Sequence, residues 1–241
     1  MLGVAAATMD PEPHAYFGLV MDRGVVVGAG LRTTSRLIVS REGAAGAMAA
    51  LAADAVGPHM RDVLGPRAAV ESFVLAVGGQ WKLLMEQGIY ECRSVTASSA
   101  APGGRRVALP DDRERVAEFV QGLSFEALDE WINMNEALVR ADAHIANGAM
   151  HVWEHDDEIV SLAAAVAPTP NGIRINHVYT PPALRGRGYA GALVASLTQA
   201  MLDAGRRFVF LHTDLSNPVS NRLYVRLGYR QIGDLDVLRR G

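Results

Sequence analysis

The sequence predicts a mixed α/β protein of two domains, because strand-like and helix-like segments alternate along both halves of the 241-residue chain. Apolar residues alternate in short runs and follow helical spacing in longer ones, as strands and amphipathic helices require. The small-residue stretch from Ser98 to Gly104 interrupts this order and has the composition of an interdomain linker. We therefore expect a first domain at residues 1–97, a linker at 98–105 and a second domain at 106–241.

In the second half, the expected elements follow the order strand, helix, helix, three strands, helix, strand, helix, strand. Asp111 and Asp112 are expected to begin the first helix, and Gly205 to end the helix before the last two strands. A second helix is expected from about Phe125 to Ile145, with Trp131 on its apolar side. The remaining expected elements are strands at 106–110, 150–154, 159–167, 173–180 and 208–213, and helices at 189–204 and from 218.

The first half has a shorter series of the same kind. Strands are expected at 15–22, 25–33, 36–40, 62–64 and 88–95, and helices at 41–55 and 68–77. Arg23-Gly24 is expected to join the first two strands as a tight turn. The segment Ser40–Gly46 connects a strand to a helix and carries an acidic residue, Glu42.

The turn before the helix at 189 has the composition of an anion site. The chain reads Val178-Tyr179-Thr180-Pro181-Pro182-Ala183-Leu184-Arg185-Gly186-Arg187-Gly188-Tyr189-Ala190. The two glycines let the backbone approach an anion, the two arginines offer forked donors, and the helix start offers unpaired amides. These features predict a site for a pyrophosphate, whereas the spacing matches neither a dinucleotide-binding loop nor a P-loop.

Two motifs in this half, one at Arg185, Gly188 and Ala190 and one from Asn217 through Tyr224 to Tyr229, are similar to those of the GNAT superfamily of acetyl-CoA-dependent N-acetyltransferases. Arg185, Gly188 and Ala190 match the pattern R-x-x-G-x-A. The pattern N-x-x-S-x-x-L-Y-x-x-x-G-Y follows at the usual distance, with Asn217 at its start and Tyr224 in its helix. The resemblance extends from about residue 106 to the C-terminus.

The resemblance implies a GNAT fold, which is a mixed and mostly antiparallel sheet flanked by helices. It implies acetyl transfer from acetyl-CoA to a primary amine of a small molecule or peptide, by direct attack in a ternary complex. Val178, Tyr179 and Thr180 would align the pantetheine arm and supply an oxyanion donor, and Asn217 would bond the arm or order the site. Tyr224 would be the general acid for the CoA thiolate. The pyrophosphate would be bound by Arg185, Gly186, Arg187, Gly188, Tyr189 and Ala190.

Residues 1–97 are interpreted as a degenerate GNAT-like domain that binds cofactor poorly, because Glu42 stands where a pyrophosphate site needs donors. An unrelated α+β cap is the alternative. The general base is open as well: His177 has a suitable intrinsic pKa, while Glu126 or Glu136 could act through water.

Composition excludes several other classes. The net charge of −3 and the lack of basic runs argue against nucleic acid as a partner, and no segment predicts a membrane span or a signal peptide. The single cysteine, Cys92, suits a reducing cytoplasmic location and a packing role. His151 and His155 are four residues apart, but their strand-like context predicts no metal site. A non-catalytic acyl-CoA-binding regulator remains an alternative function, and the first half could serve to form a homodimer.

Overall fold

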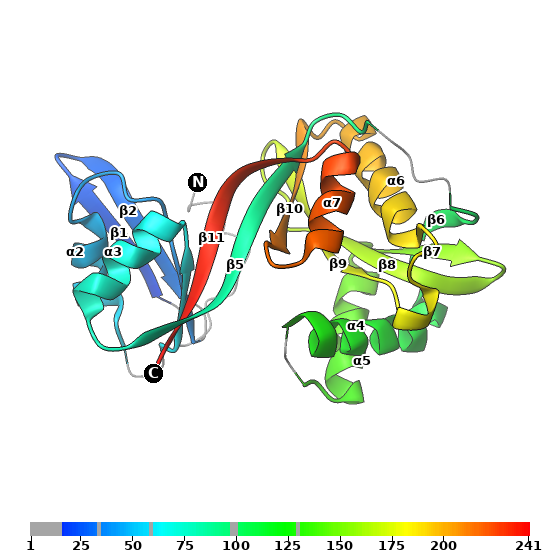
Figure 1. Cartoon of the computed structure of the whole chain (residues 1–241), viewed down its shortest axis with the longest axis horizontal. Helices are drawn as coiled ribbons and strands as arrows, with labels where there is room; N and C mark the ends of the chain where they lie inside the picture. Colours follow the sequence, from blue (N-terminus) through cyan, green and yellow to red (C-terminus); the bar gives the residue numbers. More distant parts are fainter. Residues whose placement is uncertain (1–15, 33–34, 58–59, 97–100, 129–130) are drawn as a thin grey trace. The chain divides into compact units, whose positions relative to one another are not determined.

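The computed structural model describes residues 16–32, 35–57, 60–96, 101–128 and 131–241 (Figure 1). These residues form two compact units. Unit 1 takes the chain up to Ile89 together with Asp214–Ser216 and Gly233–Gly241, and unit 2 takes Tyr90–Thr213 and Asn217–Ile232. The N-terminal segment and the part of the expected linker at 98–100 lie outside the described residues.

Unit 1 is a small sheet covered by two helices. Its strand order is β1-β2-β3-β4-β11, with β3 parallel to β4 and the other pairs antiparallel. Leu37, Val63 and Phe73 are fully buried where the two helices pack on the sheet. The elements are β1 Tyr16–Asp22, β2 Val25–Arg32, β3 Arg36–Val39, α2 Ala47–Ala55, β4 Asp62–Gly65, α3 Arg67–Val77 and the first part of β5 Trp81–Cys92.

The expected turn at Arg23-Gly24 is confirmed. Both residues have positive φ, 48° and 82°, which is the backbone that a two-residue hairpin of right-handed twist requires. The helix after β3 is shorter than expected, because Gly46 adopts the left-handed conformation at its N-cap and α2 begins only at Ala47. The strand expected from residue 88 is longer than expected, since β5 starts at Trp81.

Unit 2 is a larger mixed sheet with helices on both faces (Figure 1). Its strand order is β5-β10-β9-β8-β7-β6; β10 is parallel to β9, and the pairs from β9 to β6 are antiparallel. The elements are β6 Gly104–Val107, the 3-10 turn η1 Pro110–Asp112, α4 Arg113–Leu128, α5 Met134–Ala146, β7 Met150–His155, β8 Glu158–Val166, β9 Gly172–Tyr179, the 3-10 turn η2 Pro182–Leu184, α6 Tyr189–Asp203, β10 Phe208–Asp214, α7 Pro218–Arg226 and β11 Arg230–Arg240.

Helices α4 and α5 cover one face of the unit 2 sheet, and α6 and α7 lie on the other (Figure 1). On the first face, Val116, Val120 and Leu162 are buried together. On the second face, Leu193 and Leu197 of α6 are fully buried. The predicted α/β class, with a mostly antiparallel sheet flanked by helices, is confirmed.

The units differ from the expected domains in three places, one of which is the short segment Asp214–Ser216 that belongs to unit 1. The last part of β11 belongs to unit 1, where Asp236 to Arg239 pair with β4, and residues 90–97 are not part of unit 1. The pairing of β11 with β4 joins positions more than 160 residues apart, so no local pattern in the sequence reports it. Strand β6 also begins at Gly104, inside the stretch expected as linker.

The second helix of unit 2 starts later than the sequence suggests. Asn133 accepts a hydrogen bond from the Glu136 amide at 3.0 Å, and Glu136 accepts one from the Asn133 amide at 2.9 Å. This reciprocal cap fixes the start of α5 at Met134. The expected apolar position Trp131 therefore precedes the helix and is 76% exposed, whereas Ile132 is buried.

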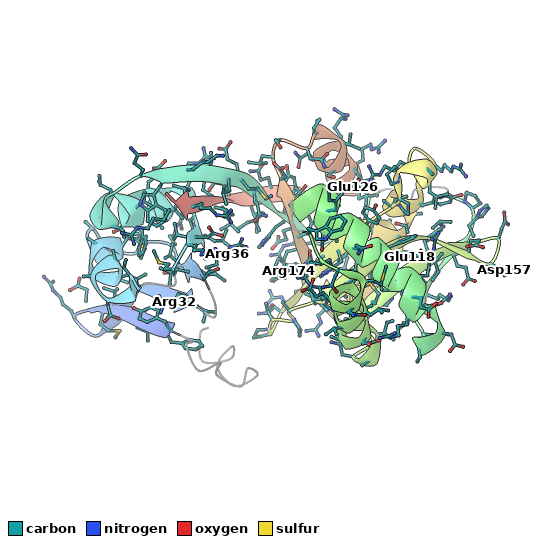
Figure 2. The ribbon with its side chains drawn as sticks, turned by 90° about the horizontal axis from the view of Figure 1, so that it is seen from below. Arg32, Arg36, Glu118, Glu126, Asp157 and Arg174 are labelled. Carbon is teal, nitrogen blue, oxygen red and sulfur yellow. The ribbon has the colours of Figure 1, made fainter. Side chains whose placement is uncertain are left out.

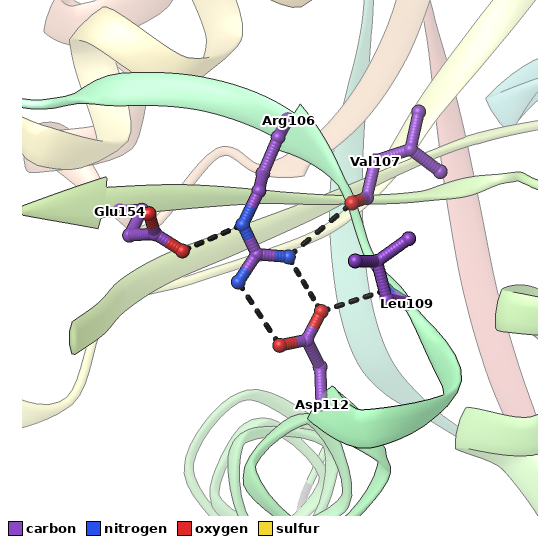
Figure 3. Close-up of polar contacts among 5 residues, drawn as sticks. All are labelled: Arg106, Val107, Leu109, Asp112 and Glu154. Atoms are coloured by element: carbon purple, nitrogen blue, oxygen red, sulfur yellow. Dashed lines mark hydrogen bonds and ion pairs between the residues drawn. The ribbon is translucent and has the colours of Figure 1, made fainter. Parts of the chain in front are cut away.

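A half-buried arginine ties the first strand of unit 2 to the start of its first helix (Figure 3). Arg106 donates to Glu154 at 2.6 Å and binds Asp112 through both terminal nitrogens, one of them at 3.0 Å. Asp112 also accepts from the Leu109 amide at 2.7 Å. These charge-assisted hydrogen bonds stabilise the strand-to-helix connection.

We expect Asp112→Asn to lower the free energy of unfolding by about 1–3 kcal/mol, because it weakens charge-assisted hydrogen bonds at a side chain that is 13% exposed. Urea denaturation followed by circular dichroism measures this change. Asp142→Asn is the matched control: Asp142 also pairs with an arginine, Arg113, but is 48% exposed and should change stability little. Equal effects of the two substitutions would contradict the assignment.

The same carboxylate predicts a pH dependence. Hydrogen bonds from Arg106 hold the pKa of Asp112 below its usual value. The stabilisation is therefore complete above the unfolded-state pKa of about 4 and is lost as the pH falls through the folded-state pKa. The stability difference between the wild type and Asp112→Asn should accordingly shrink in acid.

Candidate cofactor and acyl-transfer site

The parallel strands β9 and β10 are paired over only a short stretch. Their register joins Gly172, Ile173 and Arg174 to residues 208–210. Strand β9 then runs on to Tyr179, and β10 runs on to Asp214, without further pairing between them. The later part of β9 therefore presents an unpaired backbone edge, to which an extended chain could add as a strand.

A β-bulge lies in this unpaired part of β9. Leu162 pairs with Tyr179 and Ala164 pairs with Asn176, so two residues of β9, His177 and Val178, lie opposite one residue of β8. His177 has a φ of 53°, and its amide donates to the side chain of Asn176 at 2.8 Å. A bulge removes backbone groups from the ladder. The bulge overlaps the segment, beginning at Val178, that is expected to align the pantetheine arm and to supply the oxyanion donor.

Buried hydroxyl groups fix the end of β9. Ser161 donates to the Tyr179 carbonyl at 2.9 Å and lies 2.8 Å from the Thr180 hydroxyl. Tyr179 packs its ring edge-on against Phe119. The three residues predicted to line the cofactor arm, Val178, Tyr179 and Thr180, thus end a strand that the neighbouring core holds rigidly.

The glycines of the following turn have the backbone that the sequence predicts for them. Gly186 and Gly188 have φ of 79° and 85°, and Gly188 is the N-cap of α6. A side chain at Gly186 would meet no atom within 4 Å, so the space above the turn is open. Tyr189 is buried and Ala190 half-buried in the first turn of the helix. The amides of this helix start can therefore face an anion.

The two arginines of the turn differ in their contacts. Arg185 donates to the Thr180 carbonyl at 2.8 Å and forms an ion pair with Glu126, and its guanidinium lies 5.6 Å from the centre of the Tyr179 ring. Arg187 is exposed and makes one long contact, at 3.5 Å, to the Ala183 carbonyl. Arg185 thus fixes the turn, while the side chain of Arg187 is available to a ligand.

Helix α7 carries the second motif. The Asn217 side chain accepts hydrogen bonds from the amides of Val219 and Ser220 at 3.2 Å and thereby caps the helix. Tyr224 is buried with its ring 5.9 Å from that of Tyr229, whose hydroxyl bonds Thr198 of α6. Among the described residues, no group hydrogen-bonds the Tyr224 hydroxyl.

The structure separates the three candidates for the general base. Glu126 accepts from the Tyr179 hydroxyl at 2.6 Å and pairs with Arg185, and Glu136 caps α5. Both carboxylates thus have structural partners. Burial, aided by His144 and two arginines, lowers the pKa of His177 to about 4, so its ring is neutral at pH 7.

A basic cluster near His177 was not predicted from the sequence. It consists of Arg174 on β9, His212 on β10 and His144 on α5, which lie within electrostatic reach of one another or of His177. Figure 2 labels Arg174 among the side chains of unit 2. The only signal in the sequence is polar side chains at inward-facing strand positions, and that signal requires the strand register to interpret.

The equivalent turn of unit 1 is arranged differently. The Glu42 carboxylate accepts a hydrogen bond from the Met48 amide at 3.2 Å, in the first turn of α2. A cavity of about 460 Å³ lies beside this helix start, and Arg67 on its wall pairs with Asp236 at 3.1 Å. The chain's own carboxylate therefore takes the position where an anion would meet the amides of α2.

Other candidate residues have local partners. Cys92 is buried, its thiol contacts the Ser94 carbonyl, and burial raises its pKa. His151 is buried beside Arg105, with 3.1 Å between the ring and the guanidinium. In the part of the chain that the structure describes, no three His, Cys, Asp or Glu side chains are grouped as a metal site. Within the same residues, no helix is both long and apolar enough to cross a membrane.

Comparisons with known proteins identify acetyltransferases as similar to this chain. Residues 114–229 match the model of the acetyltransferase (GNAT) family. A GCN5-related N-acetyltransferase from Sphaerobacter thermophilus has a similar structure, with a TM-score of 0.70, 16% identity, and coverage of 99% of this chain and 84% of that one. A GNAT-family acetyltransferase from Colwellia psychrerythraea is similar with a TM-score of 0.64 and 10% identity, over 95% of this chain and 86% of that one.

A tandem GNAT protein from the clavulanic acid biosynthesis pathway is similar too, with a TM-score of 0.57 and 14% identity, over 95% of this chain and 83% of that one. No curated protein sequence matches the chain. The structural likenesses are at low identity and show the fold, while the family model covers both motifs and the turn between β9 and α6. The segment from 114 to 229 is therefore an acetyltransferase domain of the GNAT family.

Proposed function

We propose that the chain transfers an acetyl group from acetyl-CoA to a primary amine of a small molecule or peptide, by direct attack in a ternary complex. The observation that supports this proposal most strongly is that the unpaired, bulged edge of β9 leads directly into the open glycine turn at the start of α6, so that one extended cofactor could contact both. With its single cysteine buried and unpaired, the chain suits the reducing cytoplasm, where we place this activity.

The donor end of the site would bind the pyrophosphate of CoA. The amides from Gly186 to Ala190 converge at a helix N-terminus, where the helix dipole favours negative charge. Arg187 is exposed beside them and supplies a forked cation. Arg185 would contribute through its backbone and by fixing the turn, because its guanidinium is occupied by Glu126 and Thr180.

The strand end of the site would orient the acyl group. Residues 178–180 would hydrogen-bond the extended pantetheine arm, as an added strand does. A backbone amide released from the ladder by the bulge can donate to the oxyanion that forms when the amine attacks the thioester carbonyl. Asn217 would order the nearby turn through its cap of α7.

Tyr224 would protonate the leaving thiolate. The amine adds to the thioester carbonyl to form the carbon–nitrogen bond and the oxyanion, and the nitrogen gives up its extra proton to the general base. The oxyanion then collapses as the carbon–sulfur bond breaks, and the sulfur leaves with the electron pair and takes the phenolic proton of Tyr224. Burial raises the pKa of Tyr224 to about 12, which keeps the hydroxyl protonated at neutral pH as an acid must be. Of the three residues considered as base, Glu126 and Glu136 are held by structural partners. His177 has a neutral ring, which could accept a proton.

Unit 1 would not bind a second cofactor in this proposal. Glu42 already fills the anion position at α2, which supports the interpretation of the first half as a degenerate GNAT-like domain. The similarity to a tandem GNAT protein supports it as well. A non-catalytic acyl-CoA-binding regulator remains the second candidate, because the Arg187 turn alone would suffice for it; loss of activity without loss of binding on changing Tyr224 separates the two.

We expect acetyl-CoA at millimolar concentration to raise the melting temperature of the protein, and Arg187→Glu to abolish the shift. The substitution places a carboxylate against the pyrophosphate, where the wild type offers a cation. Differential scanning fluorimetry measures the effect. Arg207→Glu, an exposed arginine of the same unit, is the control and should keep the shift. The cofactor assignment is wrong if the wild type shows no shift.

We expect Tyr224→Phe to lower kcat about tenfold or more and to leave the acetyl-CoA melting shift intact, because only the proton of the general acid is removed. Release of free thiol, in a screen of amino acids, polyamines, aminoglycosides and peptides as acceptors, measures the rate. Tyr90→Phe removes a hydroxyl that bonds Gln231 in the same unit and should leave kcat unchanged. An unchanged rate for Tyr224→Phe would assign this residue to packing.

A further inference from the structure

Arg174 and His212 lie on the same face of the unit 2 sheet, where β9 and β10 begin to separate. Arg174 pairs with Val166 of β8, which packs on the core beneath α4 and α5, so its side chain is on the α5 face. Phe210 is its partner on β10, and His212 follows two residues later on the same face. Arg174, the last residue of β9 that pairs with β10, thus places its guanidinium near the imidazole of His212.

Two further histidines adjoin this position. His177, in the bulge of β9, packs its ring 4.8 Å from the ring of His144 on α5. In both rings Nδ1 is buried without a hydrogen-bond partner, and the Nε of Arg174 is in the same condition. Buried polar atoms normally have partners, and three unpaired ones in one cluster indicate a site completed by a ligand.

The positive charge of the cluster indicates that the ligand is negatively charged. Among the described residues, no carboxylate forms an ion pair or hydrogen bond with Arg174, His177 or His212. Burial lowers the pKa of the Arg174 guanidinium and, with Arg174 itself, lowers that of His212 to about 4. A partly buried cation whose charge is not neutralised attracts an anion, and neutral imidazoles beside it can donate ring N–H groups to that anion.

The cluster is separate from the predicted pyrophosphate site. Arg174 precedes Tyr179 by five residues, which in a strand is a distance of roughly 16 Å. It also lies on the α5 face, whereas the turn at Gly186–Gly188 opens α6 on the opposite face. The cofactor and this ligand would therefore approach β9 from opposite faces and meet at the bulge around His177 and Val178.

We propose that Arg174, His177 and His212 bind a carboxylate of the acyl acceptor, so that the preferred acceptors are amino acids and not polyamines or simple amines. The inference rests on the proposed acetyl transfer, because it names the acceptor of that same site. A guanidinium matches the two oxygens of a carboxylate in one plane, and this geometry favours a carboxylate over a lone uncharged group.

The test compares amine acceptors that carry a carboxylate, an uncharged amide or a phosphate. Thiol release from acetyl-CoA is measured with α-amino acids, with their α-amides, and with O-phosphoethanolamine as the phosphate arm. We expect kcat/KM to be at least about tenfold higher for an amino acid than for its amide. Arg174→Gln should reduce this ratio to about one and leave the acetyl-CoA melting shift intact, while Arg207→Gln should change neither.

A binding measurement decides the inference without turnover. N-Acetylglycine, which carries the carboxylate, should perturb the ring NMR signals of His177 and His212 at millimolar concentration, and N-acetylglycinamide should not. Arg174→Gln should remove the response. Equal rates for acid and amide, a preference for the phosphate arm, or unchanged histidine signals with N-acetylglycine would overturn the carboxylate assignment. The acetyl-CoA melting shift reports separately on the proposed function.

Discussion

The site depends on the way β9 is shared between its two neighbours. It stays hydrogen-bonded to β8 along its length, apart from one bulge, but to β10 at only Gly172 to Arg174. Backbone groups in a sheet interior are usually paired, so this separation lets a central strand of unit 2 offer backbone groups to a ligand. The bulge at His177 adds a second consequence, because it turns that side chain toward α5 and leaves the end of the strand directed into the glycine turn. The strand end of the proposed site follows from these two departures from regular pairing.

Each unit has a strand-to-helix connection whose helix begins after a left-handed glycine, and the two connections differ in how an external anion could reach the helix amides. In unit 2 the helix starts at Gly188, the space at Gly186 is open and Arg187 is exposed, so an external phosphate can reach the amides. In unit 1 the helix also starts after a left-handed glycine, Gly46, but the Glu42 carboxylate accepts from the Met48 amide. An internal carboxylate supplies the negative charge that a helix start favours and does so without a loss of translational entropy. The two turns therefore differ in the Glu42 carboxylate and also in the backbone, because Gly186 has a φ of 79° whereas none of residues 41–45 has a positive φ.

The sequence predicted the parts of the structure that depend on local chemistry. The Arg23-Gly24 turn and the left-handed glycines at 186 and 188 each follow from a residue type and its immediate neighbours. Features that join distant residues could not be predicted in this way. The contact of Arg185 with Glu126 spans 59 positions, and the pairing of β11 with β4 spans more, so no periodicity reports either of them. The basic cluster required both the register of β9 and its bulge, because a shift of one residue would send Arg174 to the opposite face.

Two arginines of unit 2 show why the basic cluster is interpreted as functional. Arg106 is half-buried, binds Asp112 and Glu154, and has its pKa raised by these partners, so its charge is neutralised within the fold. Arg174 is half-buried too, yet its Nε has no hydrogen-bond partner and burial lowers its pKa. A fold gains nothing from an uncompensated buried charge, because the desolvation of the cation opposes folding. Arg106 therefore contributes to stability, and the cost of holding Arg174 in place is explained if an anionic ligand compensates its charge when it binds.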